Sequence, residues 1–274
     1  MRGSGRIKHI SVKLFFRHGF AFCFIVLGIV ILLFILVPLL KMVFLSDKRA
    51  LWLAFFDTET MQSVLLTIYA ALIASVIGFI LGAPLAYLLA RYDFPFKSIL
   101  EGLIDLPIVV PHSAAGIALL FVFGGNFLVG RWFNQIGLQF VDSLAGIVIA
   151  MLFVSVPILI NSAKESFRKV DVRLEKVART LGASHWQTFF RISFPLAWRS
   201  ILAGSLIMWA RGMSEFGAVV ILTYHPMTAP VLIYERFEAY GLTQAAPVAT
   251  IMIIISAFVF ISIQALLRRR EDND

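Results

Sequence analysis

Two ionisable residues four positions apart, Arg211 and Glu215, lie inside a strongly apolar stretch of the chain. Residues with this spacing share one face of a helix, so the two side chains are able to form an ion pair. A charge at the centre of a membrane helix costs about 2.5–3.5 kcal/mol on insertion scales, and such groups usually face the protein interior or water. The pair therefore either holds a helix in place or belongs to a gate or pathway, and the sequence leaves both interpretations open.

Helix-breaking and polar residues gather in a second apolar stretch, DLPIVVPHSAAG at 105–116. Two prolines within five residues free backbone groups and disfavour a regular helix there. Irregular backbone at membrane depth has to be buried in protein or line a cavity, so the stretch forms either a kink or part of a pathway. We expect His112 to be an interior histidine with satisfied ring nitrogens. The residues expected to belong to a pathway or gate are Asp105, Pro111, His112, Ser113, Arg211, Ser214, Glu215 and Gly217.

The sequence contains none of the common catalytic or metal-binding patterns. There is no G-x-x-x-x-G-K-[ST] phosphate loop, and no glycine is followed by lysine. The five histidines are scattered without metal-ligand spacing, and no G-x-S-x-G motif surrounds any serine. We therefore expect no catalytic residue, no metal site and no cofactor in this chain, and any work driven by ATP would need a separate ATPase.

The elements that carry these residues are predicted to be transmembrane helices. Hydrophobic residues make up 60% of the 274 positions and charged residues 15%, against about 45–50% and 25% in soluble domains. Several apolar runs reach the length of about 20 residues that a membrane helix needs, and the alternating pattern of a membrane barrel is absent. The chain is predicted to be an all-α integral membrane protein with six spans, at 19–43, 62–89, 99–123, 143–162, 198–222 and 243–267.

Lysine and arginine positions predict the orientation of these spans. Five cations precede the first span, two follow the second, eight lie within 164–199 and three lie in the tail, whereas the opposite loops carry two, one and one. Cytoplasmic loops are enriched in these residues, so we expect both termini to be cytoplasmic. Because the cations flank apolar runs, the net charge of +8 indicates topology in the cell membrane rather than nucleic-acid binding.

The predicted organisation is a single membrane unit with short charged ends. The first apolar run is too long for a signal peptide and is expected to be a retained anchor. Its Cys23 is the only cysteine, which excludes an intrachain disulfide. The predicted regions are a basic arm at 1–18, a first helix and external loop at 19–61, a core at 62–267 with a cytoplasmic loop at 164–197, and a charged tail at 268–274.

The cytoplasmic loop contains the basic stretch EKVARTLGASHWQTFFRISFP at 175–195, which is predicted to form two short helices. Gly182 stands where the first helix would end in a left-handed cap. Ser184 and Gln187 have the spacing of a capping box for the second helix, whose aromatic face includes Trp186 and Phe189. An apolar stripe on the first helix consists of Val170, Leu174, Val177, Ala178 and Leu181. Such helices either lie on the lipid surface or enter a groove on a soluble partner.

The spacing E-x-x-A-x-x-x-G-x(9)-I-x-[LF]-P in this stretch resembles the "EAA" loop of binding-protein-dependent ABC importer permeases. The resemblance implies the fold of those permeases, with coupling helices that dock on a nucleotide-binding subunit. Lys176 stands where the family's glutamate is usual, Glu175 is one place earlier, and Phe194 replaces a leucine. The residues expected to take part in ATPase coupling, from the resemblance and from the aromatic face of the second helix, are Glu175, Ala178, Gly182, Ala183, Trp186, Phe189, Ile192 and Pro195.

Two further stretches, DLPIVVPHSAAGIALL at 105–120 and WARGMSEFGAVVILTYHPMTAPVLIYERF at 209–237, resemble permeases of molybdate and tungstate importers. The resemblance implies a homodimer with its pathway on the two-fold axis, two ATPase subunits that bind ATP and Mg, and an external oxyanion-binding protein. Sulfate importers are a close alternative, often with glycine where Ser214 stands. A secondary transporter would often show repeats with broken helices, and none is evident. A membrane-embedded enzyme would need a catalytic constellation that the sequence lacks.

Overall fold

A computed structural model of the chain describes residues 19–271, and every regular element within this range is helical. The basic arm expected at 1–18 and residues 272–274 of the tail lie outside the described residues. The chain divides into two compact units, Met1–Asp47 and Lys48–Asp274. The elements are α2 (Gly19–Leu45), α3 (Lys48–Phe56), α4 (Thr58–Arg91), α5 (Lys97–Val109), α6 (His112–Phe123), α7 (Leu128–Gln135), α8 (Leu144–Lys169), α9 (Val172–Thr180), α10 (His185–Thr188), the π-helical turn η1 (Phe189–Ser193), α11 (Phe194–Met213), α12 (Gly217–Leu222), α13 (Ala229–Tyr240) and α14 (Leu242–Glu271).

The first unit contributes one long apolar helix, α2. Its sequence is apolar all round, and none of the side chains at 21–44 is buried within its own unit. Cys23 lies on this helix and is exposed. A helix that is hydrophobic on every side is typical of a membrane span or of the core of a larger assembly, which agrees with the predicted first span.

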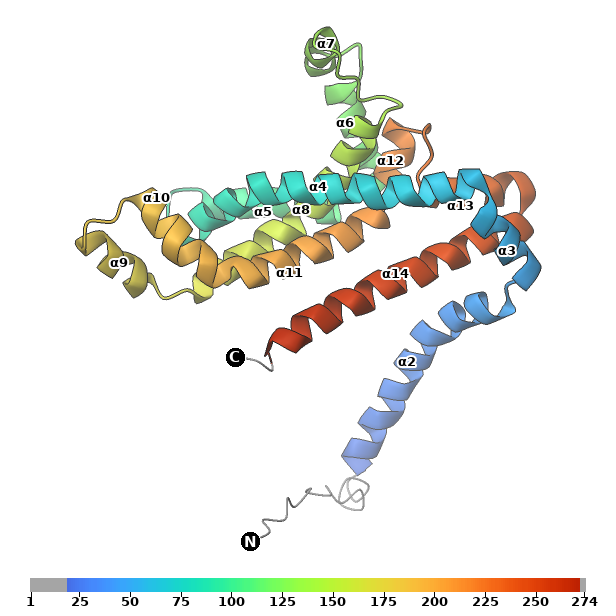
Figure 1. The fold of residues 1–274 in the computed structure, drawn as a ribbon, viewed down its shortest axis with the longest axis horizontal. Coiled ribbons are helices and arrows are strands. Elements are labelled where there is room, and N and C mark those ends of the chain that lie inside the picture. Colours follow the sequence, from blue (N-terminus) through green and yellow to red (C-terminus); the bar gives the residue numbers. More distant parts are fainter. Residues whose placement is uncertain (1–18, 272–274) are drawn as a thin grey trace. The chain divides into compact units, whose positions relative to one another are not determined.

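Three helices of the second unit, α4, α8 and α11, lie side by side and form the bundle on which the other elements pack (Figure 1). Small side chains allow helices to approach closely within a membrane. A Cβ atom on Gly78 would lie 2.5 Å from Met208 Cε of α11, and one on Gly82 would lie 3.2 Å from Ile160 Cγ1 of α8. The buried small residues of α4 recur every four positions, at Ala70, Ala74, Gly78, Gly82 and Ala86.

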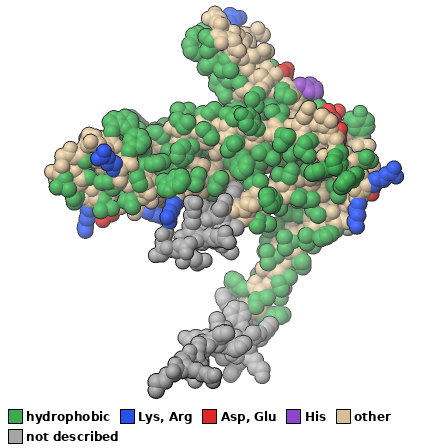
Figure 2. Space-filling model, viewed as in Figure 1, with side chains coloured by type: hydrophobic (Ala, Val, Ile, Leu, Met, Phe, Trp, Pro, Cys, Tyr) green, Lys and Arg blue, Asp and Glu red, His purple; other side chains and the backbone are tan. Residues whose placement is uncertain are grey.

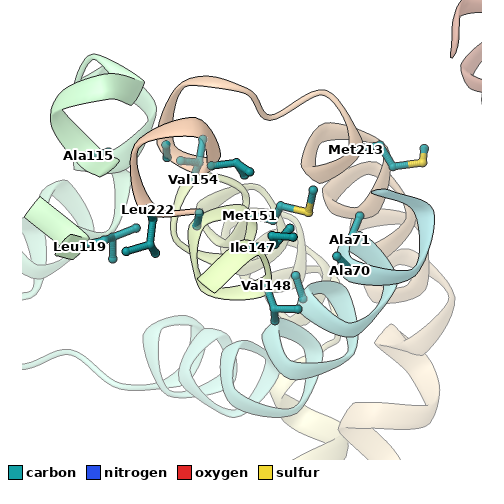
Figure 3. Close-up of a cluster of buried hydrophobic side chains, with 14 of the residues drawn as sticks. Ala70, Ala71, Ala115, Leu119, Ile147, Val148, Met151, Val154, Met213 and Leu222 are labelled. Atoms are coloured by element: carbon teal, nitrogen blue, oxygen red, sulfur yellow. The ribbon is translucent and has the colours of Figure 1, made fainter. Parts of the chain in front are cut away.

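The main apolar core joins the bundle to the two short helices α6 and α12 (Figure 3). Its buried side chains include Leu119 of α6, Ile147 of α8, Met213 of α11 and Leu222 of α12. None of these four exposes more than 6% of its surface. The core therefore fixes α6 and α12, which follow breaks in the chain, against helices that are continuous.

Five helices in the described range are long and apolar enough to cross a membrane, and a sixth crossing results if α5 and α6 form one span. The predicted departure from a regular helix at 105–116 is confirmed, because the span predicted at 99–123 consists of two helices, α5 and α6, that meet at an angle of 112°. Pro111 stands at this break as the residue before α6, whereas Pro107 lies within α5. Of the two prolines, only Pro111 therefore lies at the break.

The fifth predicted span, 198–222, is wrong in its bounds. The continuous helix runs from His185 to Met213, and α12 follows as a separate element after a break at 214–216. Ser184 caps the start of a helix as predicted, and its hydroxyl accepts a hydrogen bond from the Gln187 amide, but this helix continues into the span without a break. The loops predicted to be external also contain three helices, α3, α7 and α13.

The surface of the second unit agrees with a membrane environment. Apolar side chains cover the visible flank of the bundle, and lysine and arginine side chains gather near its ends (Figure 2). Exposed aromatic and aliphatic residues on these helices include Tyr69, Leu81, Phe121 and Phe258. Exposure of this kind over helix flanks marks a surface that lipid or another protein covers.

Candidate functional site

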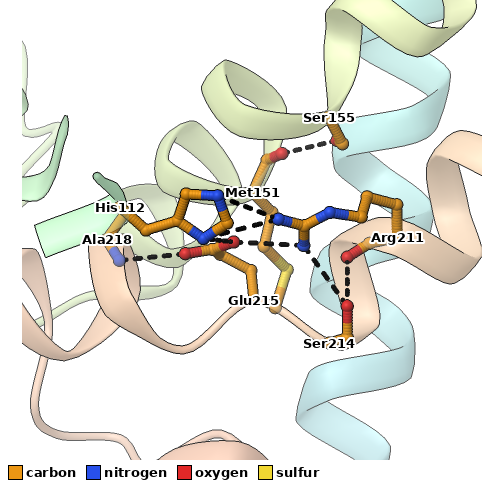
Figure 4. A network of polar contacts seen from close by, with 7 residues as sticks. All are labelled: His112, Met151, Ser155, Arg211, Ser214, Glu215 and Ala218. Atoms are coloured by element: carbon orange, nitrogen blue, oxygen red, sulfur yellow. Dashed lines mark hydrogen bonds and ion pairs between the residues drawn. The ribbon is translucent and has the colours of Figure 1, made fainter. Parts of the chain in front are cut away.

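A polar cluster lies where α6, α11 and α12 meet (Figure 4). Arg211 Nη1 donates to Glu215 Oε2 at 3.2 Å, and His112 Nδ1 lies 3.0 Å from the same carboxylate oxygen. Arg211 Nη2 also lies 3.1 Å from His112 Nε2. Glu215 is fully buried, whereas the side chains of Arg211 and His112 expose 29% and 35% of their surface. The cluster therefore has a buried anion beneath two partly exposed nitrogen groups.

The predicted pairing of Arg211 with Glu215 is confirmed, but its predicted helical geometry is wrong. Helix α11 ends at Met213, and Glu215 lies in the break that follows. The Glu215 amide donates to the Gly212 carbonyl at 3.0 Å, which is a turn rather than an α-helical bond. The second carboxylate oxygen of Glu215 accepts from the Ala218 amide at 3.0 Å and so satisfies a free donor in the first turn of α12. Helix α11 ends here because the Glu215 carboxylate caps the start of the following helix, α12.

Two glycines allow α6 and α12 to approach closely at this cluster. A Cβ atom on Gly217 would lie 2.8 Å from His112 Cβ, and one on Gly116 would lie 2.9 Å from the Ala218 carbonyl oxygen. Contacts this short do not occur between real Cβ atoms and their neighbours, so a larger residue at either position would move a helix. The missing side chain of Gly217 thus leaves room for His112 to lie against α12, in addition to any bend that the glycine allows.

The other residues predicted for a pathway or gate are divided between two places. Ser113 and Ser214 are exposed beside the cluster, and Ser214 Oγ accepts from Arg211 Nη1 at 3.3 Å. Pro111 is exposed at the break before α6. Asp105 lies apart on α5, where it accepts a hydrogen bond at 2.6 Å from Asn161 Nδ2 of α8. Sequence reasoning missed Asn161, because a single amide within an apolar run gives no sign of its partner.

The second candidate site is the coupling loop, defined here as residues 164–197, at one end of the bundle (Figure 1). The predicted left-handed cap is confirmed, since Gly182 has a φ of 90°. The capping box is confirmed as well, because Ser184 Oγ accepts from the Gln187 amide while Gln187 Oε1 accepts from the Ser184 amide. These two features hold α9 and α10 as two short helices joined by a fixed turn.

Glu175 faces inward and fastens this loop to the end of α4. It is 3% exposed, and its Oε1 atom accepts from Arg91 Nε and from Ser193 Oγ, both at 2.7 Å. Its Oε2 atom accepts from Tyr87 Oη at 3.3 Å. Arg91 also donates to the Val170 carbonyl at 3.0 Å. Within this chain, Glu175 is therefore a positioning residue and does not present its carboxylate to a partner.

The outward face of the coupling loop is apolar and aromatic. Trp186 and Phe190 expose 74% and 57% of their surface and stack with ring centroids 5.8 Å apart. Phe189 is expected beside Trp186 on this face, but the structure places it inward, against Tyr87 at 4.9 Å. The exposed apolar residues of the coupling loop also include Val172, Leu174, Val177 and Leu181.

Three further residues predicted to take part in coupling are less exposed than the aromatic pair. Ala178, Ala183 and Ile192 are partly buried. Pro195 is exposed at the second position of α11, directly after the π-helical turn η1. Because η1 continues into α11, Pro195 lies within one helix from His185 to Met213 rather than at the start of a new one. A π turn is a recognised means of accommodating such an irregularity, and it is common at functional sites.

The opposite end of the bundle carries a charged contact between α4 and α13. Arg236 Nη2 donates to Asp57 Oδ2 at 2.6 Å and to Glu59 Oε2 at 2.9 Å. Asp57 and Arg236 line a cavity of about 770 Å³ together with residues of α3 and α14. Burial alone would raise the pKa of Asp57, but hydrogen bonds from Thr60 and Arg236 outweigh it and hold that pKa below its ordinary value.

The helical bundle, its broken helices and the loop with a Gly-to-Pro framework define a membrane permease. A sequence profile described as "Binding-protein-dependent transport system inner membrane component" matches residues 77–273. The chain belongs to this family of transport permeases.

Individual relatives agree with the family. A protein of Thermococcus kodakarensis named molybdate/tungstate transport system permease protein WtpB is 42% identical over 252 residues, which are 91% of this chain and 96% of the relative. A probable sulfate transport system permease protein of Chlorokybus atmophyticus is 34% identical over 80% of this chain and 78% of its own. The crystal structure of a bacterial ABC transporter for import of the polysaccharide alginate has a TM-score of 0.73 at 15% identity and covers 94% of this chain and 98% of its own. That structural likeness supports the fold alone.

Proposed function

We propose that this chain is the permease subunit of an ABC importer for molybdate and tungstate. The observation that carries the proposal is the outward face of the coupling loop, because an exposed Trp186–Phe190 stack at one end of a membrane bundle suits a groove on a soluble partner. The substrate is inferred from relatives at 41–42% identity that are named for molybdate and tungstate, against 34% for the sulfate permease of Chlorokybus.

The proposed assembly has two copies of this chain, two ATP-binding subunits and an external oxyanion-binding protein, within membrane lipid. ATP and Mg would be bound by the partner subunits, and this chain would hold no cofactor and carry out no catalysis. A bacterial alginate ABC transporter of similar fold was crystallised in complex with a periplasmic protein that holds an alginate pentasaccharide, which supports the kinds of partner proposed. Both termini and the coupling loop are proposed to be cytoplasmic, on the distribution of lysine and arginine.

The substrate is tested with the purified complex, reconstituted in liposomes with its binding protein. Molybdate or tungstate is expected to stimulate ATP hydrolysis and to be taken up, and sulfate at the same concentration is expected to do neither. Stimulation by sulfate alone would assign the chain to the sulfate importers. Uptake that depends on an ion gradient and continues without ATP would instead indicate a secondary transporter.

The topology is tested by labelling single cysteines with an impermeant reagent. In a Cys23→Ser background, Lys169→Cys in the coupling-loop region and Arg131→Cys on α7 are expected to react from opposite faces of the membrane. Both side chains are exposed: Lys169 is the last residue of α8, and Arg131 lies on the short helix α7. Labelling of both from the same side would overturn the proposed orientation.

A further inference from the structure

The polar cluster of Arg211, His112 and Glu215 has a solvent-accessible side that no contact within the chain explains. Ser113 and Ser214 are exposed beside it, and Arg211 and His112 are each about one third exposed. Exposed polar groups at membrane depth do not face lipid, because nothing there replaces their hydrogen bonds to water. This face must therefore meet water or another protein chain.

The hydrogen bonds of the cluster assign one cation and one anion to it. Arg211 Nη2 lies 3.1 Å from His112 Nε2 and 3.4 Å from His112 Nδ1, and Nδ1 also lies 3.0 Å from Glu215 Oε2. The guanidinium of Arg211 and the carboxylate of Glu215 carry opposite charges and balance each other. The Arg211 contacts described within residues 19–271 all use Nη1 or Nη2, which leaves Nε–H as a further donor.

A guanidinium is well suited to a tetrahedral oxyanion, since its planar donors are able to bind two oxygen atoms at once. In a dry environment, however, an unopposed guanidinium would hold a doubly charged anion tightly and prevent its release. Glu215 opposes it from below, at 3.2 Å and with no exposure to water that would screen its charge. The exposed side thus offers hydrogen-bond donors with little net positive charge.

The cluster also lies between the two breaks of the helical bundle. His112 begins α6 after the 112° bend, and Glu215 lies in the break between α11 and α12. Short helices that follow such breaks are able to shift relative to the continuous ones, and so bring the donors together or separate them. A weak anion contact at this point could be formed and lost within one transport cycle.

We propose that Arg211, beside His112, forms a passing contact for the transported oxyanion, and that Glu215 keeps the affinity of this contact low. The inference rests on the proposed function, because it assigns the substrate of that transport to a place within the chain. It predicts that removing the charge of Glu215 raises the affinity for the oxyanion, so that the protein retains an anion that the wild type releases.

The test is equilibrium binding of radiolabelled tungstate to the purified permease–ATPase complex in the absence of the binding protein. The wild-type complex is expected to lose tungstate on desalting. Glu215→Gln keeps the shape of the side chain and is expected to bind tungstate at least about tenfold more tightly. Adding Arg211→Gln to that variant is expected to abolish the retention, which a purely structural role of the cluster would not produce.

Glu175→Gln is the matched control. It removes the charge of another buried carboxylate that is paired with an arginine, at the other end of the bundle, and it is expected to retain no tungstate. His112→Lys is a second variant that adds a cation beside Arg211 without changing Glu215, and it is expected to retain tungstate. It decides the question if Glu215→Gln fails to assemble.

The proposal is overturned if assembled Glu215→Gln or His112→Lys complexes bind no more tungstate than the wild type. It is overturned as well if retention survives Arg211→Gln or appears equally in Glu175→Gln. Failure of the proposed function is recognised separately, because the wild-type complex with its binding protein would then show no ATP hydrolysis stimulated by molybdate or tungstate.

Discussion

Arg91 and Glu175 meet at 2.7 Å across 84 positions of the sequence, and their side chains expose only 7% and 4% of their surface. One belongs to the last turn of α4 and the other to the first turn of α9. The pair therefore fastens the coupling loop to a helix of the bundle, so that a displacement of α9 has to be shared with α4. Ser193 and Tyr87 complete the contacts of the carboxylate.

Breaking this buried pair is expected to destabilise the protein strongly. Glu175→Ala leaves Arg91 without its anion, and removing one partner of a buried pair typically costs about 3–5 kcal/mol. The measurement is thermal unfolding of the two single variants and the double variant with Arg91→Ala, analysed as a double-mutant cycle. Asp93→Ala serves as the control, since Asp93 pairs with Lys97 at the surface and is 98% exposed. Additive single effects at Arg91 and Glu175 would show that the two residues are not coupled.

Gly182→Val is expected to uncouple transport from ATP hydrolysis or to release the ATPase. Nothing lies within 4 Å of a Cβ atom at Gly182, so the cost arises from its φ of 90° and amounts to about 1–2 kcal/mol in strain. Membrane insertion and dimerisation should be unaffected. Gly137→Val is the control, because Gly137 has a φ of 81° and equally open surroundings but follows α7. Equal coupling in both variants would contradict a special role for the turn at Gly182.

Trp186→Ala is expected to weaken the retention of the ATPase during purification. An aromatic residue at the centre of an interface is commonly worth about 2 kcal/mol or more, and truncation of Phe190 in the same stack should have an effect in the same direction. Phe258→Ala is the control, since Phe258 on α14 is 71% exposed, close to the 74% of Trp186. If the ATPase is retained equally by all three variants, the outward face of the coupling loop is not the docking site.

Gly217→Ala is expected to reduce transport by displacing His112 from the polar cluster. The added methyl group would lie 2.8 Å from His112 Cβ, so α6 and α12 have to separate. Overpacking of this kind typically costs about 1–3 kcal/mol. The measurement is molybdate uptake together with the melting temperature, and Gly102→Ala on α5 is the control because no atom lies within 4 Å of its Cβ. Unchanged uptake in Gly217→Ala would show that the close approach is not needed.

The contact of Asp57 with Arg236 is expected to stabilise the protein at neutral pH and not in strong acid. Because the pKa of Asp57 in the folded protein lies below its ordinary value of 3.8, the carboxylate binds fewer protons in the folded state. The contribution of Asp57 to the stability of the folded protein is complete above the pKa that this group has in the unfolded chain. It decreases as the pH falls through the pKa of Asp57 in the folded protein. The difference in melting temperature between wild type and Asp57→Asn should therefore vanish in acid, and a difference independent of pH would exclude an electrostatic origin.

Local features of the two sites could be predicted from the sequence because neighbouring residues determine them. Gly182 takes the left-handed cap, Ser184 and Gln187 form a capping box, and Arg211 reaches Glu215, as their spacing indicates. Long-range partners could not be predicted in this way. Nothing in the spacing of Arg91 and Glu175 points from one to the other, and the same holds for Asp105 and Asn161.

Helix bounds were harder to predict where polar groups cap one another. The break at 214–216 arises because Glu215 caps α12, which outweighs the apolar character of the surrounding run. The short helices α7 and α13 were missed because charged and aromatic residues interrupt them. The small residues of α4 at every fourth position, from Ala70 to Ala86, mark the face that α8 and α11 cover.

The π turn at Phe189–Ser193 lies within the helix that joins the two candidate sites. It determines how side chains before the turn are oriented around the helix axis relative to those after it. Trp186 and Arg211 belong to one uninterrupted helix of 29 residues, which at a rise of 1.5 Å per residue measures roughly 44 Å. Each residue of an α-helix turns the direction of its side chain by about 100°, so one residue more or fewer in this turn would point the Trp186–Phe190 face to a different side of the axis. The length of a single helical turn thus decides the direction in which the Trp186–Phe190 stack faces relative to Arg211 near the other end of the helix.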